Sequence, residues 1–376
     1  MVGGGQGAFI GAVHRIAARL DDRWELIAGA FASDPDRARD SAAALHVAPE
    51  RAYGSFADMA EREAGRPDRV DAVAIVTPNH MHFAPAAAFL ERGIAVICDK
   101  PLTHRMEDAL ALAEIVHRTG VPFALTHNYT GYPMVRHARA MVKSGALGAV
   151  RVIQAEYPQE WLTTKLEDTG QKQAAWRTDP ERSGAAGCLG DIGTHAFNLA
   201  EFVTGLRCES VAADLTTFVP GRALDDNAQM LLRFEGGARG ALWSSQVAPG
   251  NENGLRLRVY GERGGLEWAQ EQPNQLRHSP FGEPSRLICR AGAGAGPEAA
   301  HASRIPAGHP EGYLEAFAQL YRDFADQLEA RRDRRPPDPA SMLVPGIEAG
   351  IRGMRFIAAA LASAGANSCW TGLDAV

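Results

Sequence analysis

The chain has 376 residues, of which 45% are hydrophobic and 22% are charged, and this size and balance predict about two globular domains. Its formal net charge of -6 gives no electrostatic reason to bind nucleic acid, and no apolar run is long enough to cross a membrane. Five widely spaced cysteines without a C-x-x-C pair are expected to be free thiols, and without a secretory signal we expect a cytoplasmic protein.

The first 127 residues alternate short apolar runs with amphipathic stretches. Strands are predicted at 25–32, 71–76, 95–98 and 122–126, with helices at 35–45, 83–92 and 106–117. Strands that alternate with helices indicate right-handed crossovers and a parallel sheet. We therefore predict an N-terminal Rossmann dinucleotide-binding domain over residues 1–127.

Residues 128–376 follow another pattern, in which strands succeed one another with few helices between them. Strands are predicted at 150–157, 210–219, 227–234, 240–246 and 255–260, a loop at 291–310, and helices at 191–203, 312–331 and 344–364. Glycine-rich turns between the later strands indicate a mostly antiparallel sheet. The second domain is thus predicted to be an α/β substrate domain, with a C-terminal helix able to pack back toward the first.

A glycine-rich segment, GGGQGAFIG, occupies residues 3–11. Glycines at the start of a dinucleotide fold let the backbone turn tightly, approach the pyrophosphate and aim a helix N-terminus at it. The motif is imperfect, because Gly3-x-Gly5 is followed by Ala8 and Gly5-x-Gly7 by Ile10. A flexible tail is the alternative, which the strand–helix alternation disfavours. The strand before the loop is nearly absent, so either the recorded start is late or this strand is unusually short.

The end of the second predicted strand bears on the choice between NAD and NADP. An acidic residue usually stands there and binds the ribose 2′-hydroxyl, but this chain has Ser33, and Asp34 is predicted to cap the helix that begins at Pro35. Without that carboxylate a 2′-phosphate is not repelled, and Arg37 is close by in the sequence. The cofactor is therefore expected to be NAD or NADP, with the preference open.

Two segments carry groups suited to hydride transfer. Lys100 follows the strand at 95–98, at the sheet edge where ligands bind, and Asp191 and His195 stand four residues apart at a helix start. Oxidation of a carbinol needs a base, and histidine titrates near the working pH, while an ammonium stabilises alkoxide character. Taken alone, Lys100 could be a surface lysine in a turn. Asp191 and His195 alone could equally be a pair of metal ligands or a solvated helix start.

The order of several motifs resembles the glucose-fructose oxidoreductase / inositol dehydrogenase / rhizopine catabolism family over nearly the whole chain. The motifs are Thr77-Pro78-Asn79 with His82 soon after, Asp99-Lys100-Pro101-Leu102, Trp176-Arg177, and residues 184–195. The resemblance implies a Rossmann domain followed by an open-faced sheet, which commonly packs against a second copy, so we expect a homodimer or homotetramer. The chain departs from the family pattern at Asp99, where a glutamate is usual, and at Ala185 and Ala186, within a usual triple glycine.

The resemblance also implies roles for residues. His195 is expected to be the acid/base, Asp191 to aid it and bind a hydroxyl, and Lys100 to contact the substrate hydroxyl and the nicotinamide ribose. The expected cofactor-binding residues are Gly3, Gly5, Gln6, Gly7, Ala8, Phe9, Ile10, Ser33, Arg37, Thr77, Pro78, Asn79, His82, Asp99, Lys100 and Asn128. The expected substrate-binding residues are Lys100, Tyr129, Trp161, Lys165, Arg177, Asp191, His195, His309 and Tyr313.

The expected function is oxidation of a secondary or anomeric hydroxyl of a sugar, glycoside or inositol by hydride transfer to NAD(P)+, without a metal ion. A first alternative is a non-catalytic NAD(P)-binding sensor on the same fold, which would be expected to lose the lysine or the histidine. A second is metal-assisted chemistry with Asp191, His195 and His309, although a carboxylate–histidine pair makes a poor zinc site without a third well-placed ligand.

Overall fold

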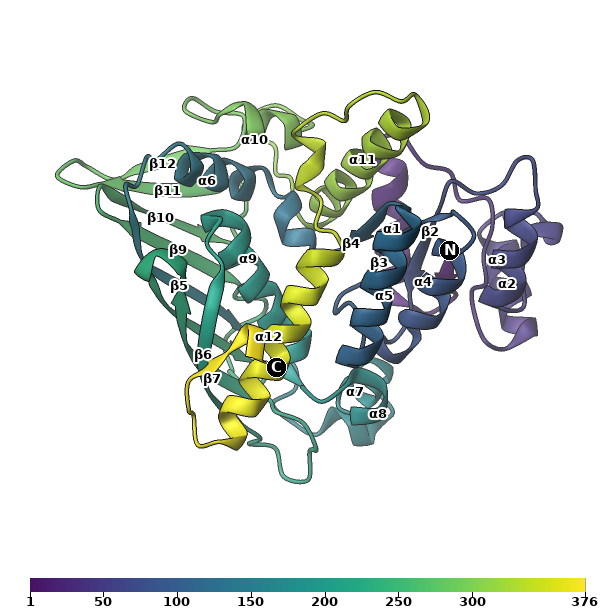
Figure 1. The fold of residues 1–376 in the computed structure, drawn as a ribbon, viewed down its shortest axis with the longest axis horizontal. Coiled ribbons are helices and arrows are strands. Elements are labelled where there is room, and N and C mark those ends of the chain that lie inside the picture. Colours follow the sequence, from purple (N-terminus) through teal and green to yellow (C-terminus); the bar gives the residue numbers. More distant parts are fainter. Residues whose placement is uncertain (376) are drawn as a thin grey trace. The chain divides into compact units, whose positions relative to one another are not determined.

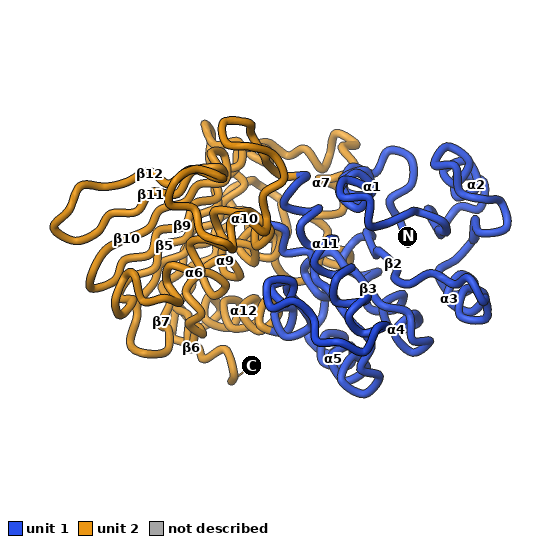
Figure 2. Tube along the Cα trace, turned by 90° about the horizontal axis from the view of Figure 1, so that it is seen from above, with its two compact units in different colours: residues 1–128, 314–351 blue, residues 129–313, 352–376 orange. Residues whose placement is uncertain are grey.

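The computed structural model describes residues 1–375, which divide into two compact units (Figure 2). Unit 1 consists of residues 1–128 and 314–351, and unit 2 consists of residues 129–313 and the chain from 352 onward. The predicted division at 127/128 lies one residue from the first crossing between the units, and a later segment is added to unit 1. Within residues 1–375 no helix combines the length and apolarity needed to cross a membrane.

Unit 1 contains a four-stranded parallel sheet (Figure 1). Its order is β1-β2-β3-β4, formed by Val2–Gly3, Ala72–Val76, Ala95–Cys98 and Phe123–Leu125. The strands β2, β3 and β4 are wholly apolar, as expected for parallel strands that are covered on both faces. The three strands predicted in this region are confirmed to within about one residue at each end.

The strand predicted at 25–32 is wrong as a regular strand. Only two isolated parallel bridges form there, between Val2 and Ala30 and between Gly29 and Ala52. The short β1 offers only two residues for pairing, and a glycine within the segment weakens strand formation. The bridges still extend the sheet beyond β1, so the chain order reverses at β1. Such a reversal is the switch point at which doubly wound folds bind dinucleotides.

The helices of unit 1 flank this sheet. They are α1 (Phe9–Leu20), α2 (Pro35–Ala44), α3 (Phe56–Ala64), α4 (Phe83–Leu90), α5 (Met106–Thr119) and most of α11 (Tyr313–Arg332). The predicted cap of α2 is confirmed, because the Asp34 side chain accepts a hydrogen bond from the Arg37 N–H at 2.8 Å and Pro35 begins the helix. The short α3 was not predicted, although Ser55 caps it in the same way.

Unit 2 contains a nine-stranded sheet in the order β12-β11-β10-β9-β5-β8-β7-β6-β13. Only the pair β5–β8 is parallel, so the predicted mostly antiparallel sheet is confirmed. Sequence analysis missed β10 to β13, of which β10 begins with two glycines, β11 is mostly polar, and β12 and β13 have only four and two residues. The strands are β5 (Val150–Pro158), β6 (Cys208–Thr216), β7 (Asn227–Phe234), β8 (Arg239–Ser245), β9 (Arg256–Gly261), β10 (Gly264–Ala269), β11 (Gln275–Pro280), β12 (Arg286–Cys289) and β13 (Thr371–Gly372).

Helices α6 and α9 pack on one face of the nine-stranded sheet (Figure 1). The other face carries alternate exposed side chains, such as Leu231 of β7 and Val152 of β5. The segment predicted as a loop at 291–310 contains the short helix α10, so that prediction was incomplete. The helices are α6 (Pro133–Lys143), α7 (Lys172–Arg177), α8 (Pro180–Ser183), α9 (Thr194–Thr204), α10 (Pro297–Ala302) and α12 (Ile347–Gly365), which begins in unit 1.

Candidate active site

Glycines bring β1, the following loop and α1 close together in unit 1. Gly3, Gly4 and Gly7 have φ values of 76°, 71° and 76°, which side-chain-bearing residues rarely adopt. A Cβ on Gly3 would lie 2.9 Å from the Val76 carbonyl oxygen, and one on Gly11 would lie 2.4 Å from the Gly4 Cα. Gly11 therefore permits the close packing of helix and strand that the third glycine of a dinucleotide fingerprint provides. Sequence analysis quoted Gly4 and Gly11 in the motif but did not select them.

The loop leaves the N-terminus of α1 accessible. The Gly5 N–H donates to the Phe31 carbonyl at 3.3 Å and the Gln6 N–H donates to the Ser41 hydroxyl at 3.1 Å, while Gln6, Gly7 and Phe9 are exposed. An exposed helix N-terminus beside a glycine turn suits a pyrophosphate, so these residues fit the expected cofactor.

The other residues expected near the adenosine side are placed differently. Ile10 packs in the apolar cluster around Met1, so it contributes to the core. Ser33 and Arg37 are both exposed at the start of α2.

The carboxylate of Asp99 lies in a buried polar network of unit 1. Its Oδ1 is 3.0 Å from the His14 Nε2 and accepts a hydrogen bond from the Thr126 hydroxyl at 2.6 Å, while His14 Nδ1 is 2.8 Å from the Tyr321 hydroxyl. Burial by itself would raise the pKa of Asp99, but the charge and hydrogen bond of His14 and the Thr126 hydroxyl hold that pKa below its usual value. The network joins α1, the ends of β3 and β4, and α11.

His82 fastens the segment after β2 to the segment that contains Lys100. Its Nδ1 is 2.8 Å from the Pro101 carbonyl oxygen and its Nε2 is 2.9 Å from that of Thr77. Burial lowers the pKa of His82, although the charge of Asp99 and the two carbonyl oxygens act in the opposite direction. The buried His127, which sequence analysis missed, follows β4; burial and then the charge of Lys100 lower its pKa to about 3.

The remaining residues expected at the cofactor follow two strand ends of unit 1. Pro78 and Asn79 begin a short 3₁₀ turn after β2, and Asn128 comes shortly after β4. Asn79 and Asn128 are both buried. These are the carboxyl ends of parallel strands, where doubly wound folds bind ligands.

Asp191 and His195 lie on consecutive helical segments of unit 2. Asp191 belongs to a π-helical turn, Leu189–Gly193, and His195 belongs to the first turn of α9, which follows it. The helix predicted to begin at 191 therefore starts with an irregular turn. Such π turns are frequent at functional sites. Gly193 allows the turn to approach the sheet, because a Cβ there would lie 3.0 Å from the Ser244 hydroxyl.

Two donors hold the Asp191 carboxylate. Its Oδ2 accepts hydrogen bonds from the Arg177 Nε at 3.1 Å and from the Gln246 Nε2 at 2.9 Å. The Arg177 guanidinium lies over the Trp176 ring, with its central carbon 4.3 Å from the ring centroid. Arg177 was expected in the site, whereas Gln246, directly after β8, was missed. The arrangement leaves Asp191 oriented by a cation and an amide.

A pair of buried tyrosines borders the His195 ring. The ring centroids of Tyr129 and His195 are 4.8 Å apart, and the hydroxyl of Tyr129 is hydrogen-bonded to that of Tyr157. Burial raises the pKa of both tyrosines, so both remain protonated at neutral pH. The Tyr157 hydroxyl donates to the side-chain Oδ1 of Asn253 at 2.7 Å. Tyr157 ends a strand that the sequence did predict, so its position at a strand end was the available signal.

Three further residues expected at the substrate lie in unit 2 with different surroundings. The Trp161 Nε1 donates at 3.1 Å to the side-chain Oε1 of Gln159, and the Gln159 Nε2 in turn donates to the Asn253 Oδ1. Lys165 pairs with Asp168 at 3.1 Å. His309 is exposed.

Lys165 also lines a cavity of about 470 Å³. Phe218 and Trp243 line the same cavity, while Asp191 and His195 do not. Tyr313, by contrast, influences the pKa of Tyr157 and so lies within electrostatic reach of it. Among residues 1–375, no three His, Cys, Asp or Glu side chains gather as a metal-binding set.

Two family models match the chain. A model described as an oxidoreductase family with an NAD-binding Rossmann fold matches residues 1–127, and the GFO/IDH/MocA C-terminal domain model matches residues 135–267. The chain belongs to the Gfo/Idh/MocA oxidoreductase family. As a member of this family it is an oxidoreductase with a Rossmann domain for NAD or NADP.

Similar proteins cover this Gfo/Idh/MocA member almost from end to end. An uncharacterized oxidoreductase of Bacillus subtilis is 34% identical over 98% of this chain and 95% of its own length. The crystal structure of an oxidoreductase from Sinorhizobium meliloti has 54% identity and a TM-score of 0.90, covering 98% of both chains. An inositol dehydrogenase homolog from Azotobacter vinelandii, solved with NADH and myo-inositol, has 38% identity and a TM-score of 0.91, covering 99% of this chain and 96% of its own.

Proposed function

We propose that the protein is a dehydrogenase that oxidises a secondary or anomeric hydroxyl of a cyclic polyol, an inositol, a sugar or a glycoside, with NAD(P)+. The observation that carries this proposal is the group in unit 2 formed by Asp191, His195 and the tyrosine pair, which combines a candidate base with an oriented carboxylate. The similarity to an inositol dehydrogenase homolog bound to myo-inositol supports the substrate class.

The proposed reaction assigns one role to each of three groups. The hydroxyl proton of the substrate passes to the His195 imidazole, Asp191 binds a neighbouring hydroxyl and aids the histidine, and the Lys100 ammonium donates to the reacting oxygen. When bound, NAD(P)+ supplies the acceptor for the hydride that leaves the same carbon. The product is then a ketone, or a lactone when the anomeric carbon is oxidised.

Asp191 is suited to binding a substrate hydroxyl rather than to accepting a proton. Its Oδ2 accepts from the Arg177 guanidinium, and a neighbouring cation favours the charged form of a carboxyl group. A polyhydroxylated ring would also find donors and acceptors nearby in Gln246 and Asn253. A site built on such groups rejects analogues that lack a hydroxyl, because its own polar groups would then be left unpaired.

A non-catalytic sensor is the competing function. The presence of Lys100, Asp191 and His195 together favours the enzyme, since a sensor has no need of all three. The proposal further includes a homodimer or homotetramer assembled through the exposed face of the nine-stranded sheet.

The test is a screen of inositols, aldoses and glycosides with NAD+ and with NADP+, followed by formation of the reduced cofactor. We expect turnover with at least one cyclic polyol, and the better cofactor will settle the NAD/NADP preference. His195→Ala should lower kcat by about 100- to 10,000-fold, the usual contribution of a general base, while NADH binding stays close to that of the wild type. Binding of NADH without turnover on the whole panel would favour the sensor, and near-normal turnover of the variant would refute the role of His195.

A further inference from the structure

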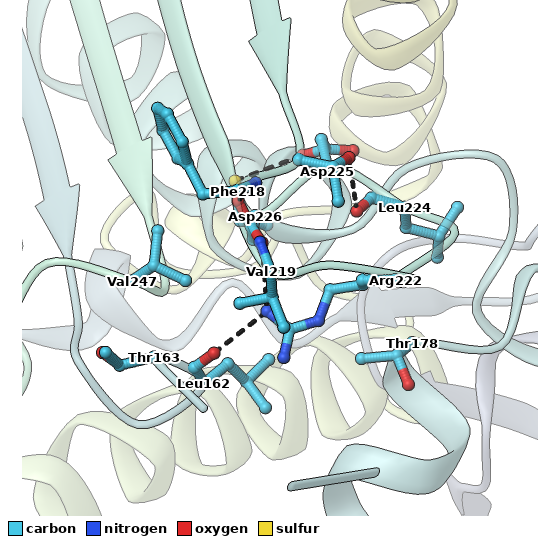
Figure 3. A network of polar contacts seen from close by, with 12 residues as sticks. Leu162, Thr163, Thr178, Phe218, Val219, Arg222, Leu224, Asp225, Asp226 and Val247 are labelled. Atoms are coloured by element: carbon cyan, nitrogen blue, oxygen red, sulfur yellow. Dashed lines mark hydrogen bonds and ion pairs between the residues drawn. The ribbon is translucent and has the colours of Figure 1, made fainter. Parts of the chain in front are cut away.

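The loop that joins β6 to β7 carries two adjacent buried carboxylates, Asp225 and Asp226 (Figure 3). Their exposed fractions are 8% and 1%. A buried carboxylate is costly unless hydrogen bonds replace the water that it loses. The partners of these two side chains therefore show which parts of unit 2 the loop holds in place.

Asp225 binds the segment that leads into the turn of Asp191. Its Oδ1 accepts from the Gly187 N–H at 2.6 Å, and its Oδ2 accepts from the Leu189 N–H at 2.8 Å and from the Cys188 thiol at 3.2 Å. The Asp225 carbonyl oxygen accepts from the Cys188 N–H at 2.9 Å. One residue thus satisfies three consecutive backbone N–H groups just where the helical segment begins.

These N–H groups need an outside acceptor. The first N–H groups of a helix have no partner within it, and a carboxylate at that end is favoured by charge-assisted hydrogen bonds. The approach is also close, because a Cβ on Gly187 would lie 2.1 Å from the Asp225 carbonyl oxygen. The segment 187–189 is therefore held in one position against the loop.

Asp226 has a different set of partners. It accepts from the N–H groups of Phe218 and Val219 at 2.8 Å and 3.0 Å, and from Arg222 at 3.1 Å. Arg222 in turn donates to the Leu162 carbonyl at 3.0 Å (Figure 3). It also pairs with Glu167. Asp226 therefore stabilises its own loop and the 162–167 segment, and only Asp225 binds the segment that carries Asp191.

We propose that Asp225 is a positioning residue of the oxidoreductase reaction. Its carboxylate fixes residues 187–189, and the continuous helical segment transmits that position to Asp191 and His195, four and eight residues after Gly187. The inference rests on the proposed function, because it assumes that Asp191 and His195 act on the substrate. Asp225 itself acts through the segment.

The test is Asp225→Asn, which keeps the volume but replaces one acceptor oxygen by an NH2 group that faces a donor. We expect kcat to fall by about 10- to 100-fold, the cost of a small misplacement of reacting groups, while the dissociation constant of NADH stays within about threefold. A loss that appears in NADH affinity and not in kcat would contradict the proposal.

Glu201→Gln is the matched control. Glu201 lies toward the other end of α9, where it accepts from the Cys208 N–H at 2.8 Å and pairs with Arg352 at 2.5 Å. This variant should lower Tm as Asp225→Asn does, but leave kcat within about twofold, since it does not touch residues 187–191. Equal kcat values for the two variants would overturn the proposal.

Two further variants keep the outcome decisive. If Asp225→Asn does not fold, Cys188→Ala removes the thiol that lies 3.2 Å from the same carboxylate and 3.5 Å from the Ser244 carbonyl oxygen. This variant should lower kcat by about threefold or more, and wild-type kcat would overturn the proposal. His195→Ala is measured in parallel. If that variant keeps its turnover, the role proposed for His195, on which the inference rests, fails; if it is inactive while Asp225→Asn behaves as the control does, only the positioning role fails.

Discussion

Single side chains set the environment of His195. The hydroxyl of Tyr157 connects Tyr129, which borders the imidazole, to Asn253 after β8. Because both phenols are buried, a change in one hydrogen bond alters the position of a ring rather than its solvation. We therefore expect this chain of hydrogen bonds to contribute to catalysis.

Tyr157→Phe removes the hydroxyl and keeps the ring. We expect the free energy of unfolding to fall by about 1 kcal/mol for the lost hydrogen bonds, and kcat to fall by about threefold to tenfold because the Tyr129 ring loses its fixed partner. The measurements are urea unfolding and steady-state kinetics. Tyr260→Phe, on an exposed tyrosine of β9, is the control and should change neither. An unchanged kcat in Tyr157→Phe would show that the tyrosine pair does not contribute to catalysis.

Asp99 provides the pH-dependent prediction. Its pKa is held below the usual value in the folded state, so its contribution to stability is present above the unfolded pKa of about 3.9 and is lost as the pH falls through the lower folded pKa. Asp99→Asn should cost about 2 kcal/mol at neutral pH, because it removes the negative charge that strengthens the hydrogen bonds with His14 and Thr126.

Urea unfolding of the wild type and of Asp99→Asn is measured from about pH 7 to about pH 3.5. The difference between their free energies of unfolding should be constant at first and should narrow below about pH 4. Glu61→Gln, on an exposed side chain of α3, should show no such difference. A difference that widens toward acid would contradict the sign of the effect.

At the residue level, sequence analysis found the groups that stand in recognisable motifs. Asp191, Arg177 and Tyr129 do meet polar or aromatic partners in unit 2. Gln246, Asn253 and Asp225 were missed because each stands in a loop after a strand, where no spacing rule marks it. Their importance comes from contacts with residues that are distant in the sequence, and those contacts depend on the register of the sheet.

The elements with strong periodicity were predicted to within a few residues, as β3, β7 and α5 illustrate. The strands β10 to β12 were missed because β10 begins with two glycines, β11 is mostly polar and β12 has only four residues. The segment 25–32 was overpredicted because its apolar run needs a longer neighbour than β1 to form a regular strand. Where the local sequence pattern gave a wrong prediction, contacts with distant parts of the chain thus determined the secondary structure.

Gly11→Ala tests the packing of β1 against α1. Alanine is the better helix former by about 1 kcal/mol, but here its Cβ would lie 2.6 Å from the Gly4 carbonyl oxygen, so the helix must move away from the loop. We expect the dissociation constant of NADH to rise by about tenfold or more, as measured by fluorescence titration. Gly54→Ala, where an added Cβ meets nothing within 4 Å, is the control. Equal affinities for both variants would show that the close approach does not matter for the cofactor.

At the scale of the whole molecule, the groups proposed to bind the cofactor and the substrate belong to different units. Lys100 and the glycine loop belong to unit 1, whereas Asp191 and His195 belong to unit 2. The sequence indicated this division through the change from alternating strands and helices to successive strands. Sequence analysis allowed a C-terminal helix to pack back toward the first domain, but it did not identify residues 314–351 as part of unit 1. The periodicity of an amphipathic helix does not specify the sheet against which it packs.

The exposed face of the nine-stranded sheet carries the final prediction. Leu231 of β7 and Val152 of β5 are 57% and 38% exposed on this face, and apolar side chains exposed on one sheet face suit an interface between copies. Sedimentation velocity of the wild type should therefore give a dimer or tetramer, and Leu231→Glu should give a smaller species, because a buried unpaired charge opposes association. Leu110→Glu is the matched control on α5 of unit 1, where the leucine is 49% exposed, and it should leave the mass unchanged. A monomeric wild type, or an unchanged mass for Leu231→Glu, would exclude this face as the interface.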